Sequence, residues 1–317
     1  MMRIAIAGAG QFAERLAHHL CLTPNPVIVL SRSPRPDFEE QYECQVIVVD
    51  YDDATGLRFT LQGVDLVIST FRGPSQISLI QAARRAGVRH FVPAEFEGGL
   101  SHRATDDVLD FGSAEALALL RQYANSNSRP MQWTVFSCGI FYERFAPGGL
   151  GAYGLGTSMS IINQGDFLVD MGEGSAHIVE TNGGGRTTYV CLTAVDDVAR
   201  FVAAAVELGL NTWPREFKMR GDRLSVRDIF ATCSNVRGAD FNLRTTRYSQ
   251  FDRELSRAAA AQDWAQWWYL QRLRATADGR YDFRVANLND MVARNDQVAF
   301  TPTPFRTWLE MLWAPPQ

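Results

Sequence analysis

The chain has 317 residues, of which 46% are hydrophobic and 21% charged, and its formal net charge is −4. This length suits one large or two fused domains, and the composition is ordinary for a globular protein. A small negative charge offers no attraction for nucleic acid or an anionic membrane, so neither partner is expected. No apolar run approaches the roughly 18 residues of a membrane span, and no basic leader suggests a signal peptide.

The cysteines are scattered along the chain rather than paired. No CxxC pattern or Cys/His cluster occurs, so neither a metal site nor a disulfide framework is indicated. We therefore expect a reduced, cytoplasmic protein without a metal. The cysteines are Cys21, Cys44, Cys138, Cys191 and Cys233.

Residues 4–20 predict a strand, a tight glycine turn and a helix. Residues 4–7 form a short apolar run typical of a strand buried on both faces, and the sequence GAGQFA follows directly. In this context, Gly8 makes the turn, Gly10 lets a pyrophosphate approach the backbone, and Ala13 lets the helix pack closely. The helix N-terminus then faces the phosphates. The cofactor-binding residues predicted here are Gly8, Gly10, Gln11, Phe12 and Ala13.

The loop after the second predicted strand indicates which dinucleotide binds. An NAD-specific unit places an acidic residue there for the ribose 2′-hydroxyl, but this chain has the sequence SRSPR at positions 31–35. Arg32 can fork onto a 2′-phosphate, with Ser31 as a further donor and Arg35 as a second cation. The alternative is that these arginines are solvated loop charges. The pattern favours NADP(H).

Strands and helices alternate through the first half, which predicts a doubly wound parallel α/β sheet. Ligands of such sheets sit outside the carboxyl ends of the strands, so Asp50, Thr70, Phe71 and Pro93 are also expected along the cofactor. The predicted strands are residues 4–7, 27–30, 45–49, 64–70, 90–93 and 133–138, and further helices are 74–86 and 110–124.

The composition changes at the glycine-rich residues 147–151, which predict either a mobile lid or a plain connector. We place a Rossmann domain at residues 1–150, completed by a helix over 193–208, and a smaller α+β substrate domain at 151–317. In that domain we predict a hairpin within 178–191, turning at 182–185, and helices over 225–234, 251–273 and 302–313. An aromatic group in the long helix lines an apolar substrate pocket or belongs to the core: Trp264, Trp267, Trp268 and Tyr269.

These motifs together resemble the NmrA-like branch of the short-chain dehydrogenase/reductase superfamily, which includes the isoflavone-reductase-like enzymes. The resemblance is carried by GAGQFA at 8–13, Arg32, HFVPAEF at 90–96, GIF at 139–141 and TAVDDVA at 193–199. It implies an NADPH-binding domain, with substrate held between it and a smaller C-terminal domain. In reductase members, hydride passes to an enone, ketone or benzylic ether, and a lysine assists. The second half looks most like fungal members, many of which tailor secondary metabolites.

The chain departs from the family pattern at the assisting lysine. The matching helix reads DFGSAEA at 110–116, and the sole lysine, Lys218, lies in a strand-like setting. A Tyr-x-x-x-Lys pair is also impossible, because Pro214 precedes Lys218 by four residues. The family serine is replaced by Ala94, and the glycine after Phe96 by Glu97.

Three outcomes follow from the missing lysine. Another side chain supplies the proton, the candidates being Glu115, Tyr142, Asp106 and His102. Alternatively, the substrate is an iminium or quinone methide that needs no acid and favours a carboxylate such as Glu115 or Glu97. In the third case there is no net reduction, and the protein is a cyclase or isomerase that retains NADP(H), or an NADP(H)-sensing regulator.

We predict an NADPH-dependent reductase of a hydrophobic small molecule from fungal secondary metabolism, acting as a monomer or homodimer. The aromatic-rich second half suits a bulky apolar substrate. The reducible group is an enone, ketone, imine or iminium, or quinone methide.

Overall fold

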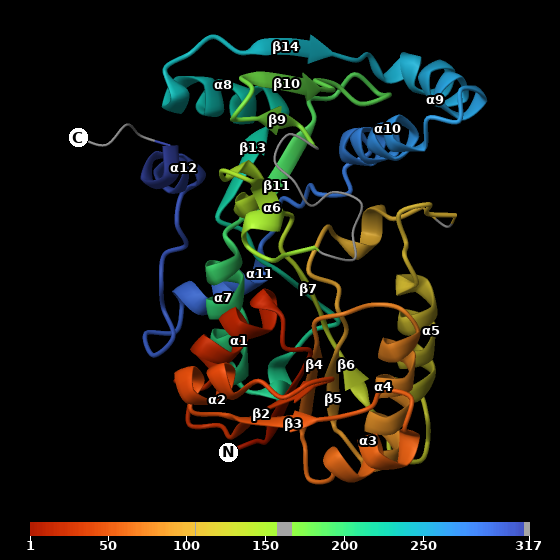
Figure 1. Cartoon of the computed structure of the whole chain (residues 1–317), viewed down its shortest axis with the longest axis vertical. Coiled ribbons are helices and arrows are strands. Elements are labelled where there is room, and N and C mark those ends of the chain that lie inside the picture. Colours follow the sequence, from red (N-terminus) through yellow and green to blue (C-terminus); the bar gives the residue numbers. More distant parts are fainter. Residues whose placement is uncertain (105, 157–166, 314–317) are drawn as a thin grey trace.

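The computed structural model describes residues 1–104, 106–156 and 167–313, and its lower part in Figure 1 is built on a parallel sheet. The strand order is β3-β2-β1-β4-β5-β6, the order of a doubly wound Rossmann fold. This confirms the predicted fold class and the six-stranded parallel sheet. The strands are β1 (Ile4–Ala7), β2 (Val27–Ser31), β3 (Gln45–Val48), β4 (Leu66–Ser69), β5 (His90–Val92) and β6 (Gln132–Trp133).

The central strand β1 is buried on both faces, which explains its continuous apolar sequence. Ile4 and Ile6 face one side, against α1 (Gln11–Leu20) and α7 (Val195–Leu208). Ala5 and Ala7 face the other side, which α3 (Ala54–Thr60), α4 (Pro74–Ala86) and α5 (Ser113–Ala124) cover. Together with α2 (Pro36–Tyr42), these helices leave the carboxyl ends of the strands free to form a site.

The predicted strand over 133–138 is in fact two short strands with different partners. β6 pairs with β5, whereas β7 (Val135–Ser137) pairs with β12 (Glu216–Lys218). The change occurs at Thr134, whose N–H donates to the Phe91 carbonyl (3.2 Å) and whose hydroxyl donates to the Pro214 carbonyl (2.6 Å). Lys218 therefore ends a strand, as its setting predicted.

The second half forms the upper part of Figure 1 around a separate apolar core. Its small sheets are β14-β10-β9 and β13-β11-β8. Their strands are β8 (Ile140–Phe141), β9 (Val169–Asp170), β10 (Ser175–Ile178), β11 (Tyr189–Thr193), β13 (Asp222–Ser225) and β14 (Asn242–Thr245). The helices here are α8 (Val226–Arg237), α9 (Phe251–Ala260), α10 (Trp264–Ala277) and α12 (Phe305–Trp313).

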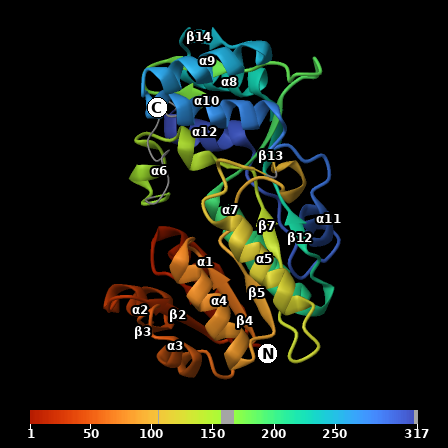
Figure 2. The ribbon, with the colours of Figure 1, turned by 90° about the vertical axis from the view of Figure 1, so that its right-hand side faces the viewer.

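The two halves are interleaved rather than joined at one boundary. α7, β12 and α11 (Asn287–Ala293) follow residue 150 in sequence, yet all contribute to the core on the sheet side. In Figure 2 these elements lie beside the part that carries the parallel sheet. α7, which lies where we predict a helix over 193–208, packs on the same core as β1, and the domain boundary at residue 150 stays a prediction.

Three predicted elements of the second half differ from the structure. The turn at 182–185 is closed by a single bridge between Thr181 and Thr187, because β10 and β11 pair with other strands. The helix predicted over 251–273 is broken into α9 and α10: Gln262 has φ +54°, and Asp263 caps the second helix by accepting from the Gln266 N–H (3.0 Å). The glycine-rich loop contains a short helix, α6 (Gly149–Ala152).

Candidate functional site

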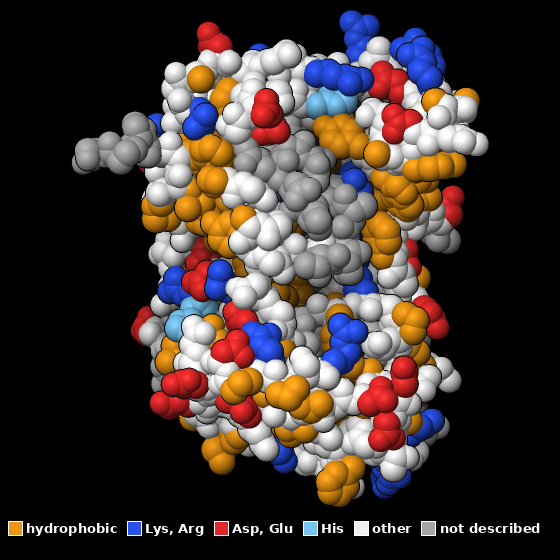
Figure 3. All heavy atoms as spheres, viewed as in Figure 1, with side chains coloured by type: hydrophobic (Ala, Val, Ile, Leu, Met, Phe, Trp, Pro, Cys, Tyr) orange, Lys and Arg blue, Asp and Glu red, His pale blue; other side chains and the backbone are white. Residues whose placement is uncertain are grey.

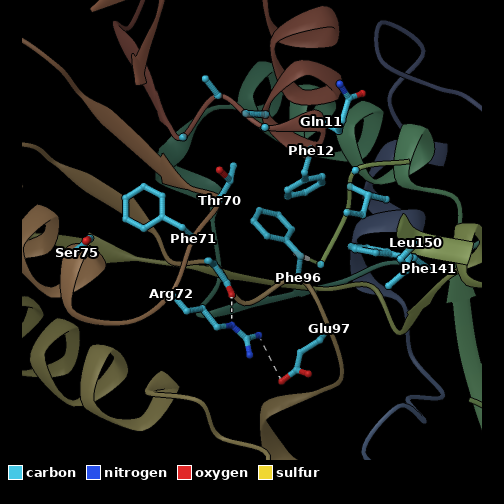
Figure 4. Close-up of a pocket in the computed structure, with 18 of the residues that line it drawn as sticks. Gln11, Phe12, Thr70, Phe71, Arg72, Ser75, Phe96, Glu97, Phe141 and Leu150 are labelled. Atoms are coloured by element: carbon cyan, nitrogen blue, oxygen red, sulfur yellow. Dashed lines mark hydrogen bonds and ion pairs between the residues drawn. The ribbon is translucent and has the colours of Figure 1, made fainter. Parts of the chain in front are cut away.

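A cavity of about 660 Å³ runs along the carboxyl ends of the parallel strands and continues beneath the second half. One end is the glycine turn and the loop after β2, and the other is formed by residues from both halves. Figure 4 shows the part between the turn and the loop after β5. The cavity therefore lies where open α/β sheets bind their ligands.

Two glycines of the turn serve different purposes. Gly8 has φ +105°, and a Cβ there would lie 2.2 Å from Thr70 Oγ1, so the turn requires glycine. Gly10 has ordinary extended backbone, and a Cβ there would have no atom within 4 Å. Its missing side chain leaves open space in front of α1, whose N-terminus has no side-chain cap. Free N–H groups facing a cavity fit a phosphate group.

The two arginines after β2 differ in their availability. Arg35 donates to the Ala9 carbonyl and pairs with Glu14 (2.8 Å) and Asp37 (3.0 Å). Arg32 is exposed, lines the cavity and makes no hydrogen bond or ion pair with any described residue. Arg32 is thus free to meet an anionic ligand, whereas Arg35 is already occupied in bracing the turn.

Most predicted cofactor residues line this cavity, and two do not. Gly8, Gly10, Gln11, Phe12, Ala13, Ser31, Arg32, Arg35, Thr70 and Phe71 all belong to its wall. Asp50 is exposed outside the wall and accepts from the Asp52 N–H (2.9 Å), and Pro93 is buried behind it. Their neighbours Tyr51 and Ala94 take these places, because side chains alternate along an extended segment.

Aromatic rings narrow the middle of the cavity. Phe12, from the first turn of α1, meets Phe96 edge to face with ring centroids 4.7 Å apart. Phe141 lies 6.0 Å from Phe12, and Figure 4 shows the three rings around the same space. A flat, largely apolar ring would be in contact with such a wall.

Arg72 and Glu97 mark the start of a charged end. The Arg72 Nε donates to the Ala94 carbonyl (2.8 Å), and its Nη2 lies 3.6 Å from Glu95 and 3.7 Å from Glu97. Figure 4 shows this guanidinium below Phe96. Arg72 and Glu97 line the cavity, while Glu95 is fully buried behind them.

Two more arginines complete a buried network around Glu97. Arg103 pairs with Glu95 (2.7 Å) and Glu97 (3.2 Å). Arg280, from the second half, pairs with Glu97 (2.9 Å) and Asp107 (2.5 Å). Burial alone would raise the pKa of Glu97, but the charges of Arg72, Arg280 and Arg103 outweigh it and hold the pKa below its usual value. Glu97 therefore stays ionised at neutral pH and is already paired with arginines.

Several further wall residues lie after β7 and belong to no motif that would select them from the sequence. Among them are Arg144, Phe167, Arg272 and Tyr281. The Arg144 guanidinium lies 5.7 Å from the Phe167 ring centre, and the Tyr281 ring meets Phe167 edge to face at 6.3 Å. They come from distant segments that converge only in the folded chain, so no local motif marks them.

None of the four predicted catalytic side chains reaches the cavity. Glu115 is exposed on α5, whose buried face carries Ser113, Ala116 and Leu117. Asp106 is exposed, and His102 is exposed with Nδ1 2.8 Å from the Gly279 carbonyl oxygen. Tyr142 is fully buried on the opposite side of its chain from Phe141, and its hydroxyl donates to the Thr303 carbonyl (3.1 Å). The geometry brings these four neither together nor to the site.

The predicted aromatic group of the long helix also lies away from the cavity wall. Trp264 is 56% exposed, and apolar side chains gather near α10 in Figure 3. Trp267 and Tyr269 pack against the core of the second half, and Trp268 stacks on Phe111 with ring centroids 5.6 Å apart. Trp267 and Tyr269 therefore fit the core alternative, whereas Trp264 and Trp268 belong neither to the cavity wall nor to that core.

Metal-ligand clusters and membrane-spanning helices are both absent from the described part of the chain. Residues 1–104, 106–156 and 167–313 contain no group of three or more His, Cys, Asp or Glu side chains placed to hold a metal ion. Among those same residues, no helix is both long enough and apolar enough to span a bilayer. In Figure 3, acidic and basic side chains are interspersed across the visible face.

Known proteins share both the sequence pattern and the fold. Residues 2–255 match the model of the NmrA-like family. Oxidoreductase BOA1 of Botryotinia fuckeliana is 24% identical over 271 residues, covering 82% of this chain and 84% of the relative. An isoflavone reductase structure superposes with a TM-score of 0.69 at 17% identity, covering 98% of each chain. The leucoanthocyanidin reductase–NADPH complex of Vitis vinifera has a TM-score of 0.69 at 13% identity, covering 99% and 100%. Since the family model covers most of its length, the chain belongs to the NmrA-like family.

Proposed function

We propose that the protein is an NADPH-dependent reductase of a hydrophobic carbonyl compound, either an enone or a ketone. The observation that carries this proposal is one continuous cavity. It links a glycine turn and an unpaired Arg32 to a charged end that contains Tyr281. The name of the Botryotinia fuckeliana relative and the NADPH bound to the Vitis vinifera neighbour support the same reading.

The cofactor end fits NADPH on its own geometry. The open space at Gly10 and the uncapped N-terminus of α1 would hold the pyrophosphate, and Arg32 would meet the 2′-phosphate. Arg32 carries the choice of NADPH over NADH, because no acidic side chain stands at the end of β2. Bound NADPH would supply the hydride, and the protein's task is to orient the acceptor and manage the proton.

The charged end favours a carbonyl over a cationic acceptor. Glu97 is the one carboxylate of the described cavity wall, and Arg103 and Arg280 already neutralise it. A carbonyl gains negative charge on oxygen as hydride arrives, and the Arg72 guanidinium stands ready to stabilise that charge. An iminium would meet arginines instead. We therefore propose the neutral acceptor among the alternatives that the sequence leaves open.

The acceptor is bulky and apolar in this proposal. Phe96, Phe141 and Phe167 line the cavity between the glycine turn and the charged end. We further propose that it is an intermediate of fungal secondary metabolism, by analogy with the fungal relative.

The test combines binding and turnover. NADPH and NADH are titrated by fluorescence, and NADPH oxidation is then followed with benzylideneacetone, 9,10-phenanthrenequinone and the cationic dye malachite green. We expect tighter binding of NADPH than NADH, and oxidation with the carbonyl probes exceeding that with the dye. Binding of NADPH without its oxidation by any of the three probes contradicts a reductase. Oxidation by the dye alone contradicts the carbonyl assignment.

A further inference from the structure

We propose that the Tyr281 hydroxyl donates the proton that completes the reduction, in place of the lysine that family reductases use. This inference rests on the proposed function. The position that carries it is remote in sequence from the motif where the lysine is expected.

Tyr281 is held firmly while its hydroxyl stays available. Its carbonyl accepts from the Cys191 N–H (2.8 Å), and the preceding Arg280 is fixed by Glu97 and Asp107. The following Asp282 forms a two-pronged pair with Arg223 (2.6 and 2.9 Å). The ring lines the cavity, but the hydroxyl makes no hydrogen bond with any described residue. Because Tyr281 is half-buried and its hydroxyl has no partner among the described residues, the hydroxyl is free to donate to a ligand.

The surrounding charges suit a phenol that gives up its proton and regains it. Burial raises the pKa of Tyr281, so the hydroxyl is protonated at neutral pH. Arg280, Arg144 and Arg272 act in the opposite direction and would stabilise the phenolate formed on transfer, against the opposing charge of Glu97. The phenol therefore carries a proton before the reaction and has cations nearby after it.

Several competing donors in the described wall are excluded by their chemistry or by hydrogen bonds that they already make. Arginines keep their protons at all relevant pH values, and Glu97 is held ionised by its arginine partners. Tyr51 lies at the other end of the cavity, and its hydroxyl already donates to the Leu30 carbonyl (3.1 Å). The Thr70 hydroxyl donates to the Ala7 carbonyl (2.9 Å).

The step balances without a further reactant. The carbonyl carbon of a ketone accepts a hydride, its C=O π pair moves onto oxygen, and that oxygen takes the proton from Tyr281. The products are an alcohol and NADP⁺, and the phenolate is reprotonated by solvent. For an enone, hydride adds to the β-carbon, and the enol formed by proton transfer converts to the saturated ketone.

The decisive experiment compares Tyr281→Phe with the matched control Tyr142→Phe, whose hydroxyl lies outside the cavity. With benzylideneacetone, we expect Tyr281→Phe to lower the single-turnover rate by about 100-fold or more, while the Kd for NADPH stays within about twofold. The control should retain the wild-type rate within about threefold.

The pH profile separates chemistry from damaged packing. The single-turnover rate of the wild-type protein should be nearly independent of pH across the neutral range, because the proton comes from the Tyr281 hydroxyl and not from solvent. In Tyr281→Phe the proton comes from solvent, so the rate should fall about tenfold per pH unit. A lower rate with an unchanged profile indicates a structural role and overturns the proposal.

The remaining outcomes are also decisive. A Tyr281→Phe rate within about threefold of wild type overturns the proton-donor role and leaves the reductase standing. Failure of the wild-type protein to oxidise NADPH with any carbonyl probe overturns the proposed function itself. If Tyr281→Phe does not fold, Tyr281→His tests the same point: a folded, NADPH-binding variant should reduce the enone with a rate that falls above the pKa of the imidazole. An inactive one overturns the proposal.

Discussion

The two ends of the cavity are built by opposite means. The glycine-turn end presents backbone N–H groups, small residues and one uncommitted cation, Arg32. The opposite end is assembled from buried charges that neutralise one another, with Glu97 at their centre. The first end is therefore prepared for a charged ligand, and the second has satisfied most of its charges internally before any ligand arrives.

Because of this difference, changes at one end should affect cofactor affinity, and changes at the other should affect the stability of the fold. At the glycine-turn end, Gly10 and Arg32 make few contacts with the rest of the described chain, so changing them should affect cofactor binding and leave the fold intact. At the charged end, Arg280 joins a segment of the second half to Glu97 and Asp107 of the first. Changes there should weaken the packing of the two halves as well as the site.

The largest effect is expected from Arg280→Met, which removes one of the three arginines around Glu97 and takes the ion-pair partner from Asp107. Removing one member of a buried charge network typically costs about 3–5 kcal/mol of unfolding free energy. Denaturant unfolding measures it, with Arg274→Met as control, because the Arg274–Asp252 pair (3.0 Å) is largely exposed. The control should lose no more than about 1 kcal/mol. Equal losses of unfolding free energy in the two variants would show that the charged end contributes no more to stability than an exposed ion pair.

A pH-dependent effect is expected at Glu143, whose side chain binds the first N–H group of α7. The carboxylate accepts from the Val195 N–H (3.0 Å), and burial raises the pKa of Glu143 to about 7. A raised carboxyl pKa favours folding below the unfolded value near 4.5, and this contribution is lost as pH rises toward 7. The loss is of the order of 3 kcal/mol.

The matched variant is Glu143→Gln, which keeps an acceptor and removes the charge. Its stability relative to wild type should rise by that amount between about pH 4.5 and 7. The variant is compared with the wild type at each pH because His90 affects the unfolding free energy in the opposite direction. Burial lowers the pKa of His90 to about 3, so its contribution to stability is lost as pH falls below 6.5. A difference that does not change with pH would show that Glu143 is not the titrating group.

A smaller effect separates the two glycines of the turn. Gly8→Ala should cost about 2 kcal/mol, because φ +105° is strained for alanine and the added Cβ meets Thr70. Gly10→Val should leave the unfolding free energy within about 0.5 kcal/mol and abolish NADPH binding, since its side chain would enter open cavity. Thermal unfolding and fluorescence titration distinguish the two. Loss of stability in Gly10→Val would contradict the open space that we assign in front of Gly10.

The same division explains what the sequence could predict. The strand, glycine turn and helix of residues 4–20 are contiguous in sequence, so a local pattern predicts them. The parallel sheet likewise follows from the short-range alternation of strands and helices. Arg72, Arg144 and Tyr281 reach the cavity only through tertiary packing, so no spacing rule selects them. Tyr142 misses the cavity for a local reason: it directly follows Phe141, and neighbouring side chains of an extended segment point to opposite sides. The break between α9 and α10 depends on the cap at Asp263, which helical periodicity does not reveal.

The smallest effect concerns Arg32 and Arg35. Arg32→Gln should weaken NADPH binding about tenfold, the loss of roughly 1.5 kcal/mol from charge-assisted hydrogen bonds to a 2′-phosphate. NADH, which lacks that phosphate, should bind as before. Arg35→Gln should change the NADPH-to-NADH ratio less, because Glu14 and Asp37 already hold its guanidinium. Fluorescence titration of both variants with both cofactors measures the ratio. If Arg35→Gln alters it more than Arg32→Gln, then Arg35 leaves its partners on binding, and the glycine-turn end is not preformed but rearranges around the ligand.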